Sequence, residues 1–455
     1  MVLFPVGLET FRFSATIEVW DFNVNGEKSM NENPQNYDDR DGNVEMFRQF
    51  QESRTPKKDV GLDDVWPLGD DFIDLPRFQI FHLSQKSEEF IRAGKTGIVI
   101  LAGGMGSRLG RLEPKGTFPI MPVTGKSLFQ VHSEKIAVLR QYYGVDIRTY
   151  IMTNRVSHEP TIEYFRENRW FGLSEADFFF FSQSELPSLN PRDGSVFYQP
   201  DGKICVGPDG HGGLITALQT SGAADDMRMH GIETINTLHV DNPIALVLNE
   251  RFLEEHLLRK SEMSSIIVEK NDGLELVGNL VHGDAEGKTL RVVEYLDFPA
   301  TMAIETNLGG TLKYWAGSIG NHLIQLDFLE RMARRIQEEP GFLPYHLPIK
   351  KIQTRNGEEW GIKPERFIFD ILPYARNPVA ARADRFEVFA TLKKDPELVR
   401  NHLSALYASW IRRAGASVPE DAQVEIAPSF ALDAETVREK IPAGTVFKGE
   451  KIFLE

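Results

Sequence analysis

A glycine-rich loop follows directly on a short apolar run in the stretch "TGIVILAGGMGSRLGRLEPKG", residues 96–116. The run "GIVILA" is continuous rather than alternating, which is typical of a strand buried on both faces of a parallel sheet. Glycines directly after such a strand allow the backbone to approach a ligand closely, because no Cβ stands in the way. The stretch therefore predicts a binding loop at the end of a buried strand.

The alternation of buried strands and helices continues along the chain. Strands are expected at "IRTYIMTN", "ADFFFFSQ" and "TINTLHVDN", with helices at residues 128–142, 161–168 and in "GGLITALQTSG". This alternation predicts an α/β fold, a doubly wound, mostly parallel and Rossmann-like sheet, whose ligands lie beyond the carboxyl ends of the strands. The strand-rich stretch 264–295 predicts an antiparallel addition to that sheet.

Four regions are expected along the chain. Residues 1–45 include a polar stretch rich in Asn and Asp, and we predict a disordered extension there. Residues 46–95 are predicted to form short helices around a Pro- and Asp-rich turn, and residues 96–395 to form the main α/β domain. A long helical pattern followed by short strands predicts a small separate α+β domain at residues 396–455.

Composition excludes several classes of protein. The chain of 455 residues has apolar and charged fractions of 41% and 26%, which fit a globular protein. Its formal charge of −15 argues against a nucleic-acid partner, which requires clustered basic charge. It has no apolar run of about 18 residues or more, so no membrane span is expected. The single cysteine, Cys205, excludes an intrachain disulfide and fits a reducing, cytoplasmic location.

Three phosphate-binding patterns can be compared with the loop. The dinucleotide pattern G-x-G-x-x-G fails, because its third glycine would fall on Leu109. A P-loop placed on "PVTGKS" fails, because Ile120 stands where its first glycine is required. The nucleotidyltransferase pattern L-x-G-G-x-G-S/T-R-L-G-x₃-P-K-G matches at every fixed position from Leu101 to Gly116. The loop therefore predicts a nucleotidyltransferase site.

The residue types in this pattern suit a nucleoside triphosphate. Main-chain N–H groups near Gly103 and Gly104 can approach a triphosphate and a base closely. Arg108 offers a planar fork of donors to the β- and γ-phosphates, where negative charge accumulates as pyrophosphate leaves. Pro114 stiffens the loop and holds Lys115 near a phosphate. We therefore expect Arg108 and Lys115 to be catalytic.

From about Trp66 to Asp395 the chain resembles the UDP-sugar pyrophosphorylase family, which contains eukaryotic-type UDP-glucose and UDP-N-acetylglucosamine pyrophosphorylases. The resemblance rests on the glycine-rich loop and on further segments in the same order: "FFFFSQ", "PDGHGG", "HVDNP", "VVEYLD", "SIGNHL", "GIKPERFIFD" and "FATLKKD". It implies an enzyme that converts UTP and a sugar 1-phosphate into a UDP-sugar and pyrophosphate. The same resemblance implies Mg²⁺ as the cofactor.

The resemblance also implies roles for individual residues. The positions that would bind UTP are Leu101, Ala102, Gly103, Gly104, Lys115, Gln183, Gly210, Asp241 and Lys363. The positions that would bind the sugar phosphate are His211, Glu294, Tyr295, Asn321 and Lys393. Asp241 would also hold Mg²⁺, and Lys393 would join Arg108 and Lys115 in catalysis. Taken alone, Asp241 could be a turn residue, and Asn321 could be an N-cap at a helix start.

The identity of the sugar depends on a few substitutions. His211 replaces the asparagine of the N-acetylglucosamine branch, and glucose-type relatives often carry histidine at this place. Ser318 stands where that branch has asparagine, and Thr391 and Lys394 stand near Lys393 where proline and asparagine would be expected. We therefore expect glucose 1-phosphate as the preferred substrate. N-acetylglucosamine 1-phosphate is the alternative, and a catalytically silent nucleotide-sugar-binding regulator is a further one; the oligomeric state is left open.

Overall fold

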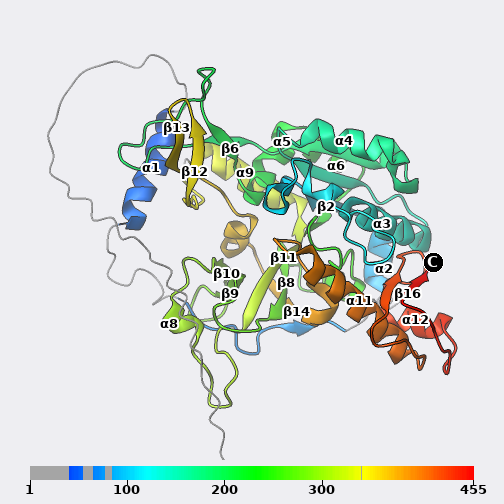
Figure 1. The fold of residues 1–455 in the computed structure, drawn as a ribbon. Helices are drawn as coiled ribbons and strands as arrows, with labels where there is room; N and C mark the ends of the chain where they lie inside the picture. Colours follow the sequence, from blue (N-terminus) through cyan, green and yellow to red (C-terminus); the bar gives the residue numbers. More distant parts are fainter. Residues whose placement is uncertain (1–39, 55–64, 77–84, 340) are drawn as a thin grey trace, which may run out of the picture. The chain divides into compact units, whose positions relative to one another are not determined.

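The computed structural model describes residues 40–54, 65–76, 85–339 and 341–455 (Figure 1). The described residues from 41 onward form one compact unit. The predicted disorder of residues 1–39 concerns positions outside the described residues. Helix α1 (Arg40–Arg54) contains the last residues of the predicted extension, so the border expected at residue 45 falls inside a helix.

A ten-stranded sheet forms the centre of the described part of the chain. Its main path runs through β1 (Ile73–Asp74), β14 (Val379–Arg382), β8 (Met263–Glu269), β11 (Ala316–Gln325), β7 (Thr234–His239), β2 (Thr96–Leu101), β3 (Thr149–Thr153) and β4 (Phe178–Ser182). Strand β11 is antiparallel to both of its neighbours on this path, and the other neighbouring pairs are parallel. The predicted α/β fold with a mostly parallel sheet is confirmed.

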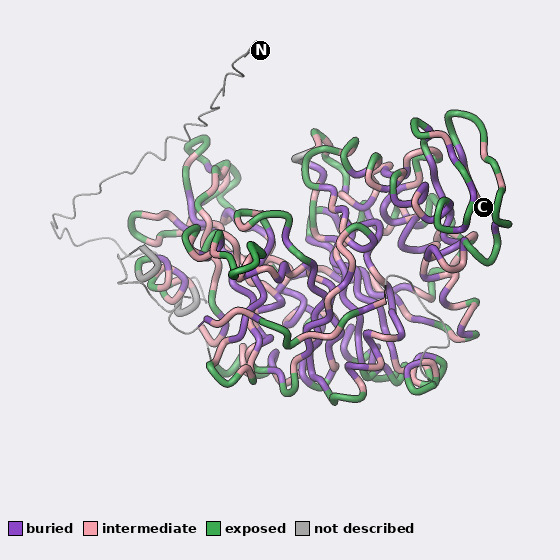
Figure 2. The backbone as a smooth tube through the Cα atoms, turned by 90° about the horizontal axis from the view of Figure 1, so that it is seen from below, coloured by how far each residue is buried: buried purple, intermediate pink, exposed green. Residues whose placement is uncertain are grey.

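Helices cover both faces of the central strands (Figure 1). Along β2, Ile98 and Ile100 belong to one apolar core, and Val99 and Leu101 belong to another, because alternate side chains of a strand point to opposite faces. The first core includes residues of α2 (Gln85–Arg92), α3 (Leu128–Tyr143), α4 (His158–Glu167) and α7 (Glu250–Leu258). The second includes residues of α5 (Leu214–Thr220), α6 (Ala223–Met229) and α9 (Leu326–Glu338). Figure 2 shows that buried segments of the backbone, drawn in purple, gather in the middle of this unit.

Helix α3 begins and ends where its sequence predicts. Ser127 Oγ accepts a hydrogen bond from the backbone N–H of Gln130 (3.2 Å), which satisfies one of the free donors of the first turn. Gly144 ends the helix in the left-handed conformation, with φ of 64°. The helix predicted at residues 128–142 is therefore present.

The strand-rich stretch 264–295 divides into two parts. Strand β8 lies on the main path of the sheet, parallel to β14 and antiparallel to β11, and is buried on both faces. Strands β9 (Gly278–His282) and β10 (Leu290–Val293) form an antiparallel pair that joins β11. The predicted antiparallel addition thus consists of β9 and β10 alone. Strand β1, inside the region expected to be helical, has two residues and is too short to leave a sequence pattern.

The C-terminal region, residues 396–455, contains α11 (Pro396–Arg413), α12 (Ala434–Lys440) and the parallel pair β15 (Gln423–Ile426) and β16 (Lys451–Leu454). Leu403 and Ile411 of α11 belong to the same apolar core as Ile98 of β2. The expected α+β tail is therefore present, but its core is continuous with that of the large sheet and does not form a separate domain. Among the described residues, no helix has the length and apolar character needed to cross a membrane.

Candidate active site

The parallel strands β7, β2, β3 and β4 end at the same edge of the sheet. Leu101, at the end of β2, is paired with Met152 of β3. The pairing continues past the strand ends, since Ala102 N–H donates to Met152 O (2.8 Å) and Gln183 N–H donates to Thr153 O (2.9 Å). The carboxyl edge of the sheet therefore brings Leu101, Ala102 and Gln183, all predicted to bind UTP, close together.

The glycine-rich loop folds back on itself after β2. Lys115 N–H donates to Gly104 O (3.1 Å), which closes the loop. Gly103 lies against the side chain of Gln183, because a Cβ at Gly103 would be 2.5 Å from Gln183 Nε2. A larger residue at position 103 would have to displace Gln183. The glycines were expected to let the backbone approach a ligand closely. At Gly103 the backbone also approaches Gln183, which is itself predicted to bind UTP.

The loop is seated on helix α3. A Cβ at Gly116 would be 2.2 Å from the ring of Phe129, so the backbone packs directly on this side chain. Arg108 lies in the short 3₁₀ turn η1 (Gly106–Leu109) of the loop. Its side chain lies outside the described part of the structure, so its catalytic role stays a prediction.

Lys115 and Asp241 form an ion pair at the carboxyl edge of the sheet. Lys115 Nζ lies 3.0 Å from Asp241 Oδ2, and the side chains are 18% and 19% exposed. Burial by itself raises the pKa of Asp241, but the charge and hydrogen bond of Lys115, together with the charges of His239 and Lys393, outweigh this and lower the pKa below its ordinary value. The carboxylate is therefore ionised. Two residues predicted from separate motifs are brought into direct contact.

A cleft of about 240 Å³ lies next to the glycine-rich loop. Its lining consists of Leu101, Gly103, Gly104, Met152, Gln183, Pro208, Gly210, His211, His239, Lys363 and Glu365. Most of these residues belong to the predicted set, although they come from segments far apart in the sequence. The position at the carboxyl ends of parallel strands is where doubly wound folds bind their ligands. This cleft is the candidate active site.

Gly210 and His211 form one wall of the cleft. Gly210 has φ of 82°, and a Cβ there would be 2.4 Å from Arg366 O, so both conformation and space require glycine. His211 Nδ1 accepts a hydrogen bond from Ile368 N–H (3.0 Å), and the ring stacks on Phe367. Burial lowers the pKa of His211 well below its ordinary value. His211 is therefore a neutral imidazole with its proton on Nε2.

Lys363 lies along another wall of the cleft. Its side chain passes over Gly207, where a Cβ would be 2.4 Å from Lys363 Cε. Burial lowers the pKa of Lys363, the charge of Lys350 lowers it further, and Glu365 opposes the effect. A nearby anion would stabilise the charged form of this lysine. The cleft thus offers a partly desolvated ammonium group to a negatively charged ligand.

Lys393 is exposed and lies close to Asp241. Lys393 Nζ donates to Leu276 O (3.1 Å), and the preceding residue, Leu392, donates its N–H to Asp241 O (2.8 Å). Burial raises the pKa of Asp241, and the charge of Lys393 helps to lower it, after the larger effects of Lys115 and His239. The segment that carries Lys393 is therefore tied to the backbone of the metal-binding candidate.

Glu294 and Tyr295 follow strand β10 and are half-buried. Burial raises the pKa of Glu294, while the charges of His346 and Lys393 oppose this rise. Because the charge of Lys393 affects the pKa of Glu294, these two residues, both predicted to bind the sugar phosphate, lie near each other. Both Glu294 and Tyr295 lie outside the lining of the cleft described above.

Asn321 lies in strand β11 rather than at the helix start expected from the sequence. Its side chain is buried, and Nδ2 donates to Leu246 O (2.7 Å). Its Oδ1 accepts from Asn236 Nδ2 (2.8 Å). The amide therefore holds the chain segment that follows Asp241, and the structure gives it this role instead of a place in the cleft lining.

His239, the last residue of β7, is a residue of the site that was not predicted from the sequence. The ring lines the cleft and meets the ring of His211 edge-on, with centroids 5.2 Å apart. Gly320, with φ of 70°, makes room for it, because a Cβ at Gly320 would be 2.5 Å from His239 Nε2. Side chains two residues apart on a strand share a face. The position of His239, two residues before Asp241, could therefore have indicated that its side chain lies on the same side of the sheet as that of Asp241.

Asp209 was also missed. Its side chain is 1% exposed, and among the described residues Oδ1 has no hydrogen-bond partner. Burial raises the pKa of Asp209 to about 7. A Cβ at Gly213 would be 1.8 Å from Asp209 Oδ1, so the turn from Gly210 to Gly213 wraps closely around the carboxyl group. Asp209 therefore shapes the turn that presents His211 to the cleft.

A family model described as "UTP--glucose-1-phosphate uridylyltransferase" matches residues 41–398. The chain belongs to this family. The matched range includes β2, β3, β4 and β7 and every residue that lines the cleft. The predicted resemblance and the predicted enzyme class, a uridylyltransferase of the UDP-sugar pyrophosphorylase kind, are confirmed.

Several relatives in this family are similar over most of the chain. "UDP-N-acetylglucosamine diphosphorylase 2" from Arabidopsis thaliana is 34% identical over 381 residues, which cover 78% of this chain and 75% of that protein. "UDP-N-acetylglucosamine pyrophosphorylase" from Saccharomyces cerevisiae is 30% identical over 390 residues, or 81% and 80% of the two chains. The crystal structure of the Trypanosoma brucei uridine diphosphate N-acetylglucosamine pyrophosphorylase, solved with an inhibitor, covers 91% of this chain and 89% of its own, with a TM-score of 0.76 and 24% identity. This last likeness supports the fold.

These relatives are named for N-acetylglucosamine, the alternative, whereas glucose was expected from His211. A physical reason lies in the state of the imidazole. Because Nδ1 of the neutral imidazole already accepts from Ile368 N–H, His211 offers a ligand one donor, Nε2–H, and an asparagine amide can offer a donor as well. His211 therefore distinguishes the two branches of the family less sharply than its bulk and potential charge suggest.

The residues of the site fit a magnesium ion held mainly by substrate. Among the described residues, no group of three or more His, Cys, Asp or Glu side chains is arranged to hold a metal ion. Mg²⁺ keeps several water ligands and is usually bound by one or two carboxylates together with substrate phosphates. The ionised Asp241, which lies outside the lining of the cleft but two residues after the cleft-lining His239, matches this donor set.

Proposed function

We propose that this protein is a UTP:N-acetylglucosamine-1-phosphate uridylyltransferase, which makes UDP-N-acetylglucosamine and pyrophosphate. The observation that carries the reaction is the Lys115–Asp241 contact of 3.0 Å beside the glycine-rich loop. The choice of sugar is supported by relatives at 34% and 30% identity that carry this name. A cytoplasmic location, expected from the single cysteine, is part of the proposal.

The proposed reaction needs no covalent enzyme intermediate. A phosphate oxygen of the sugar 1-phosphate attacks the α-phosphorus of UTP and forms a new P–O bond. The bond from the α-phosphorus to the oxygen that bridges to the β-phosphorus breaks, and pyrophosphate leaves with that oxygen and its electron pair. The protein contributes positioning and neutralisation of charge, which dominate catalysis of transfer reactions at phosphorus.

Each charged residue has a place in this proposal. Lys115 and Arg108 neutralise the phosphates of UTP as pyrophosphate leaves. Lys393, tied to the Asp241 backbone, neutralises the attacking sugar phosphate. Asp241 would hold Mg²⁺, which supplies further positive charge to the triphosphate when bound. Lys363 adds an ammonium group on the wall of the cleft.

The base and the sugar occupy different walls in this proposal. Gln183 and the backbone at Gly103 bind the uracil. Both line the cleft, and they lie in close contact with each other. His211 holds the sugar phosphate through Nε2–H, since its Nδ1 is already bonded to Ile368 N–H. Glucose 1-phosphate is the second candidate substrate, and it is favoured by the histidine at position 211.

The test is the release of pyrophosphate by the purified full chain with UTP and Mg²⁺. Glucose 1-phosphate and N-acetylglucosamine 1-phosphate are supplied separately, and kcat/KM is measured for each. We expect the higher value for N-acetylglucosamine 1-phosphate, by roughly 10–200-fold, the range that pocket contacts can provide. A higher value for glucose 1-phosphate would favour the second candidate. Absence of pyrophosphate release with every sugar phosphate would reject uridylyl transfer.

A further inference from the structure

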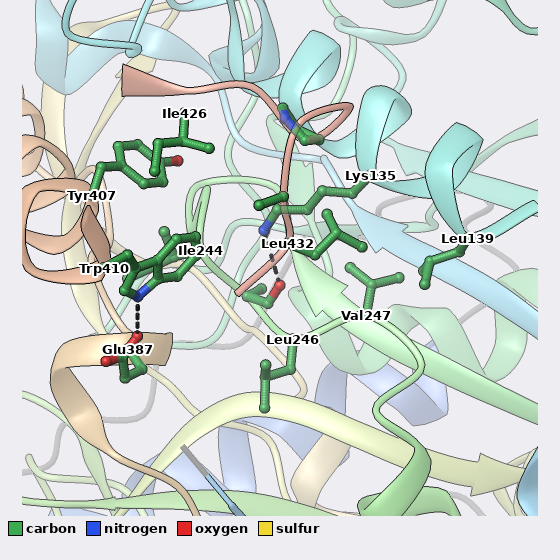
Figure 3. Close-up of a pocket in the computed structure, with 13 residues that line it drawn as sticks. Lys135, Leu139, Ile244, Leu246, Val247, Glu387, Tyr407, Trp410, Ile426 and Leu432 are labelled. Atoms are coloured by element: carbon green, nitrogen blue, oxygen red, sulfur yellow. Dashed lines mark hydrogen bonds between the residues drawn. The ribbon is translucent and has the colours of Figure 1, made fainter. Parts of the chain in front are cut away.

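A second cavity, of about 60 Å³, lies between helix α3, residues 244–247 and the C-terminal region (Figure 3). Its wall is mostly apolar but contains the charged side chains of Lys135 and Glu387. Charged groups in such surroundings are costly unless they are paired or hydrogen-bonded. The hydrogen-bond and ion-pair partners of Lys135 and Glu387 therefore indicate which parts of the structure these two side chains stabilise.

Lys135 binds the backbone that follows Asp241. Its Nζ donates to Pro243 O (2.7 Å) and to Ala245 O (3.2 Å). Burial lowers the pKa of Lys135 to about 7, so the ammonium is strongly desolvated. If the amine were removed, both carbonyl groups would lose this donor, and an apolar side chain could not replace it. Helix α3 thus holds the residues directly after the proposed metal ligand.

The backbone before Asp241 is held in a similar way. His132, one turn earlier on α3, makes a hydrogen bond from Nε2 to Val240 O (3.0 Å). Asn242 connects the same segment to a second one: Nδ2 donates to Val388 O (2.8 Å), and Oδ1 accepts from Ala390 N–H (3.1 Å). The residues on both sides of Asp241 are therefore fixed by buried polar side chains.

Glu387 connects this second segment to the C-terminal region. Its side chain is buried, it accepts a hydrogen bond from Trp410 Nε1 (2.7 Å), and it forms an ion pair with Arg413 (2.7 Å). Figure 3 shows the Trp410–Glu387 bond beside the cavity. Both partners of Glu387 lie on helix α11, and the segment that begins at Glu387 continues to Lys393. A continuous set of contacts thus joins α11 to the two residues proposed to bind metal and phosphate.

We propose that Lys135 and the Glu387–Trp410 bond are positioning elements, which hold Asp241 and Lys393 in place for the reaction and make the C-terminal region part of the active-site framework. This inference rests on the roles of Asp241 and Lys393 in the proposed function. Transfer at phosphorus depends on positioning, and a displacement of about 1 Å can lower the rate about 100-fold. Contacts that merely filled space would affect stability and leave kcat unchanged.

Four substitutions separate positioning from stability. Lys135→Met removes the ammonium group and keeps a long side chain. Trp410→Phe removes the indole donor and keeps an aromatic ring. Glu387→Gln keeps an oxygen that can accept from Trp410, whereas Glu387→Leu does not. The matched control is Asp433→Ala, because Asp433 caps α12 within the C-terminal region by accepting from Thr436 N–H (2.7 Å).

We expect Lys135→Met, Trp410→Phe and Glu387→Leu to lower kcat by about 10-fold or more while the KM for UTP changes by less than about threefold. Glu387→Gln should retain more of kcat than Glu387→Leu. Asp433→Ala should lower the melting temperature and keep the wild-type kcat when assayed well below that temperature.

Folded variants of Lys135 and Trp410 with wild-type kcat would overturn the inference, as would an equal loss of kcat in Asp433→Ala. If Lys135→Met does not fold, Trp410→Phe and the two Glu387 variants decide the question. The wild-type assay is interpreted first. Absence of pyrophosphate release by the wild type rejects the proposed function and this inference with it, whereas an active wild type with unaffected variants rejects the inference alone.

Discussion

Lys115 Nζ and Asp241 Oδ2 lie 3.0 Å apart, so the carboxylate proposed to hold Mg²⁺ is balanced by a protein cation. Lys115 stabilises the charged form of Asp241 in surroundings that are largely shielded from solvent. When a metal and a triphosphate bind, the contact between lysine and aspartate would be lost. The aspartate would then bind the metal, and the lysine would bind a phosphate. The pair therefore links metal binding to nucleotide binding.

Lys115→Met tests the catalytic part of this relationship. The variant loses a charge that acts on the leaving pyrophosphate, so we expect kcat to fall by on the order of 10²–10³-fold with the fold intact. Lys115→Arg is the matched control, because it keeps the charge and should recover part of the rate. Steady-state kinetics with UTP measure both variants. A wild-type rate in Lys115→Met would show that this lysine does not act on the leaving group.

Asp241→Asn tests the proposed metal site. The amide keeps the shape of the side chain but loses the charge that Mg²⁺ prefers, so we expect the Mg²⁺ concentration for half-maximal activity to rise about 10-fold or more. A chelator should abolish the activity of the wild type. Titration of activity with Mg²⁺ measures the effect. An unchanged titration curve in Asp241→Asn would remove Asp241 from the metal site.

Gly103→Ala and Gly104→Ala form a matched pair of substitutions in the same loop. A Cβ at Gly103 would be 2.5 Å from Gln183 Nε2, whereas a Cβ at Gly104 would be 3.5 Å from Lys115 Cε, an ordinary contact. Gly103→Ala must therefore displace Gln183, and we expect a rise of about 10-fold or more in the KM for UTP. Gly104→Ala should change this KM less. Equal effects would mean that the contact with Gln183 is not the cause.

Much of the sheet and the binding loop could be predicted because their signals are local. Continuous apolar runs mark strands such as β2 and β3, since buried parallel strands need apolar side chains on both faces. Lys115 belongs to a pattern of fixed spacing, Gln183 directly follows β4, and Asp241 lies two residues after the end of β7. The carboxyl edge of a parallel sheet then brings such residues together without further information.

The remaining features depend on partners distant in the sequence. Nothing local in the residues of α11 indicates that they share a core with β2, because an apolar helix face does not specify what it packs against. Asp209 and His239 owe their surroundings to Arg366 and Gly320, which are far along the chain. Asn321 was placed at a helix start because the bulge in β11, next to Gly320, interrupts the alternation expected of a strand.

Glu262 is a buried carboxylate held by two arginines. Its side chain is 3% exposed, Arg331 Nη2 donates to Oε2 (2.6 Å), and Arg376 Nε donates to Oε1 (2.8 Å). Burial by itself raises the pKa of Glu262, but these hydrogen bonds outweigh it and lower the pKa to about 2. The unfolded chain binds a proton at a higher pH than the folded protein does. The stabilisation is therefore fully present above pH 5 or so and is lost as the pH falls toward about 2.

Glu262→Gln should lower the free energy of unfolding by about 3 kcal/mol at pH 7, because it leaves the arginines without their buried partner. The difference from wild type should shrink as the pH falls toward 3. Urea unfolding at several pH values measures both effects. The matched control is Glu339→Gln, whose side chain is 55% exposed in its pair with Arg335 and should contribute less than about 1 kcal/mol. Equal costs for the two variants would contradict this account.

Four buried or half-buried histidines should make the protein sensitive to mild acid. Burial lowers the pKa from the ordinary value of about 6.5 to about 3 for His132, His256 and His322. It also lowers the pKa of His211 well below the ordinary value. Below pH 6.5 the unfolded chain binds protons at these positions and the folded protein does not. The free energy of unfolding therefore decreases as the pH falls, by up to about 1.4 kcal/mol per pH unit for each histidine.

Two buried groups act in the opposite direction. Burial lowers the pKa of His346, but its hydrogen bond to Asp370 and other nearby carboxylates outweigh this and raise the pKa. Its contribution is present below pH 6.5 and is lost as the pH rises through the folded value. Asp209, with its pKa raised to about 7, also binds a proton in the folded protein between about pH 4 and 7. The four histidines outnumber these groups, so we expect a net loss of stability from pH 6.5 to pH 5.

His256→Gln isolates one of these contributions. His256 is buried beside Ser264, whose Oγ lies 2.8 Å from Nδ1, and both residues lie outside the lining of the cleft, so the variant leaves the proposed substrate contacts in place. Urea unfolding midpoints at pH 7.5, 6.5, 5.5 and 5.0 give the slope of stability against pH for wild type and variant. Because glutamine does not titrate, the slope below pH 6.5 should decrease by about 1.4 kcal/mol per pH unit. Any stability lost through the altered packing and hydrogen bonding of the glutamine should be the same at every pH, so it does not affect this slope. A variant with the wild-type slope would show that His256 is protonated in the folded protein over this range.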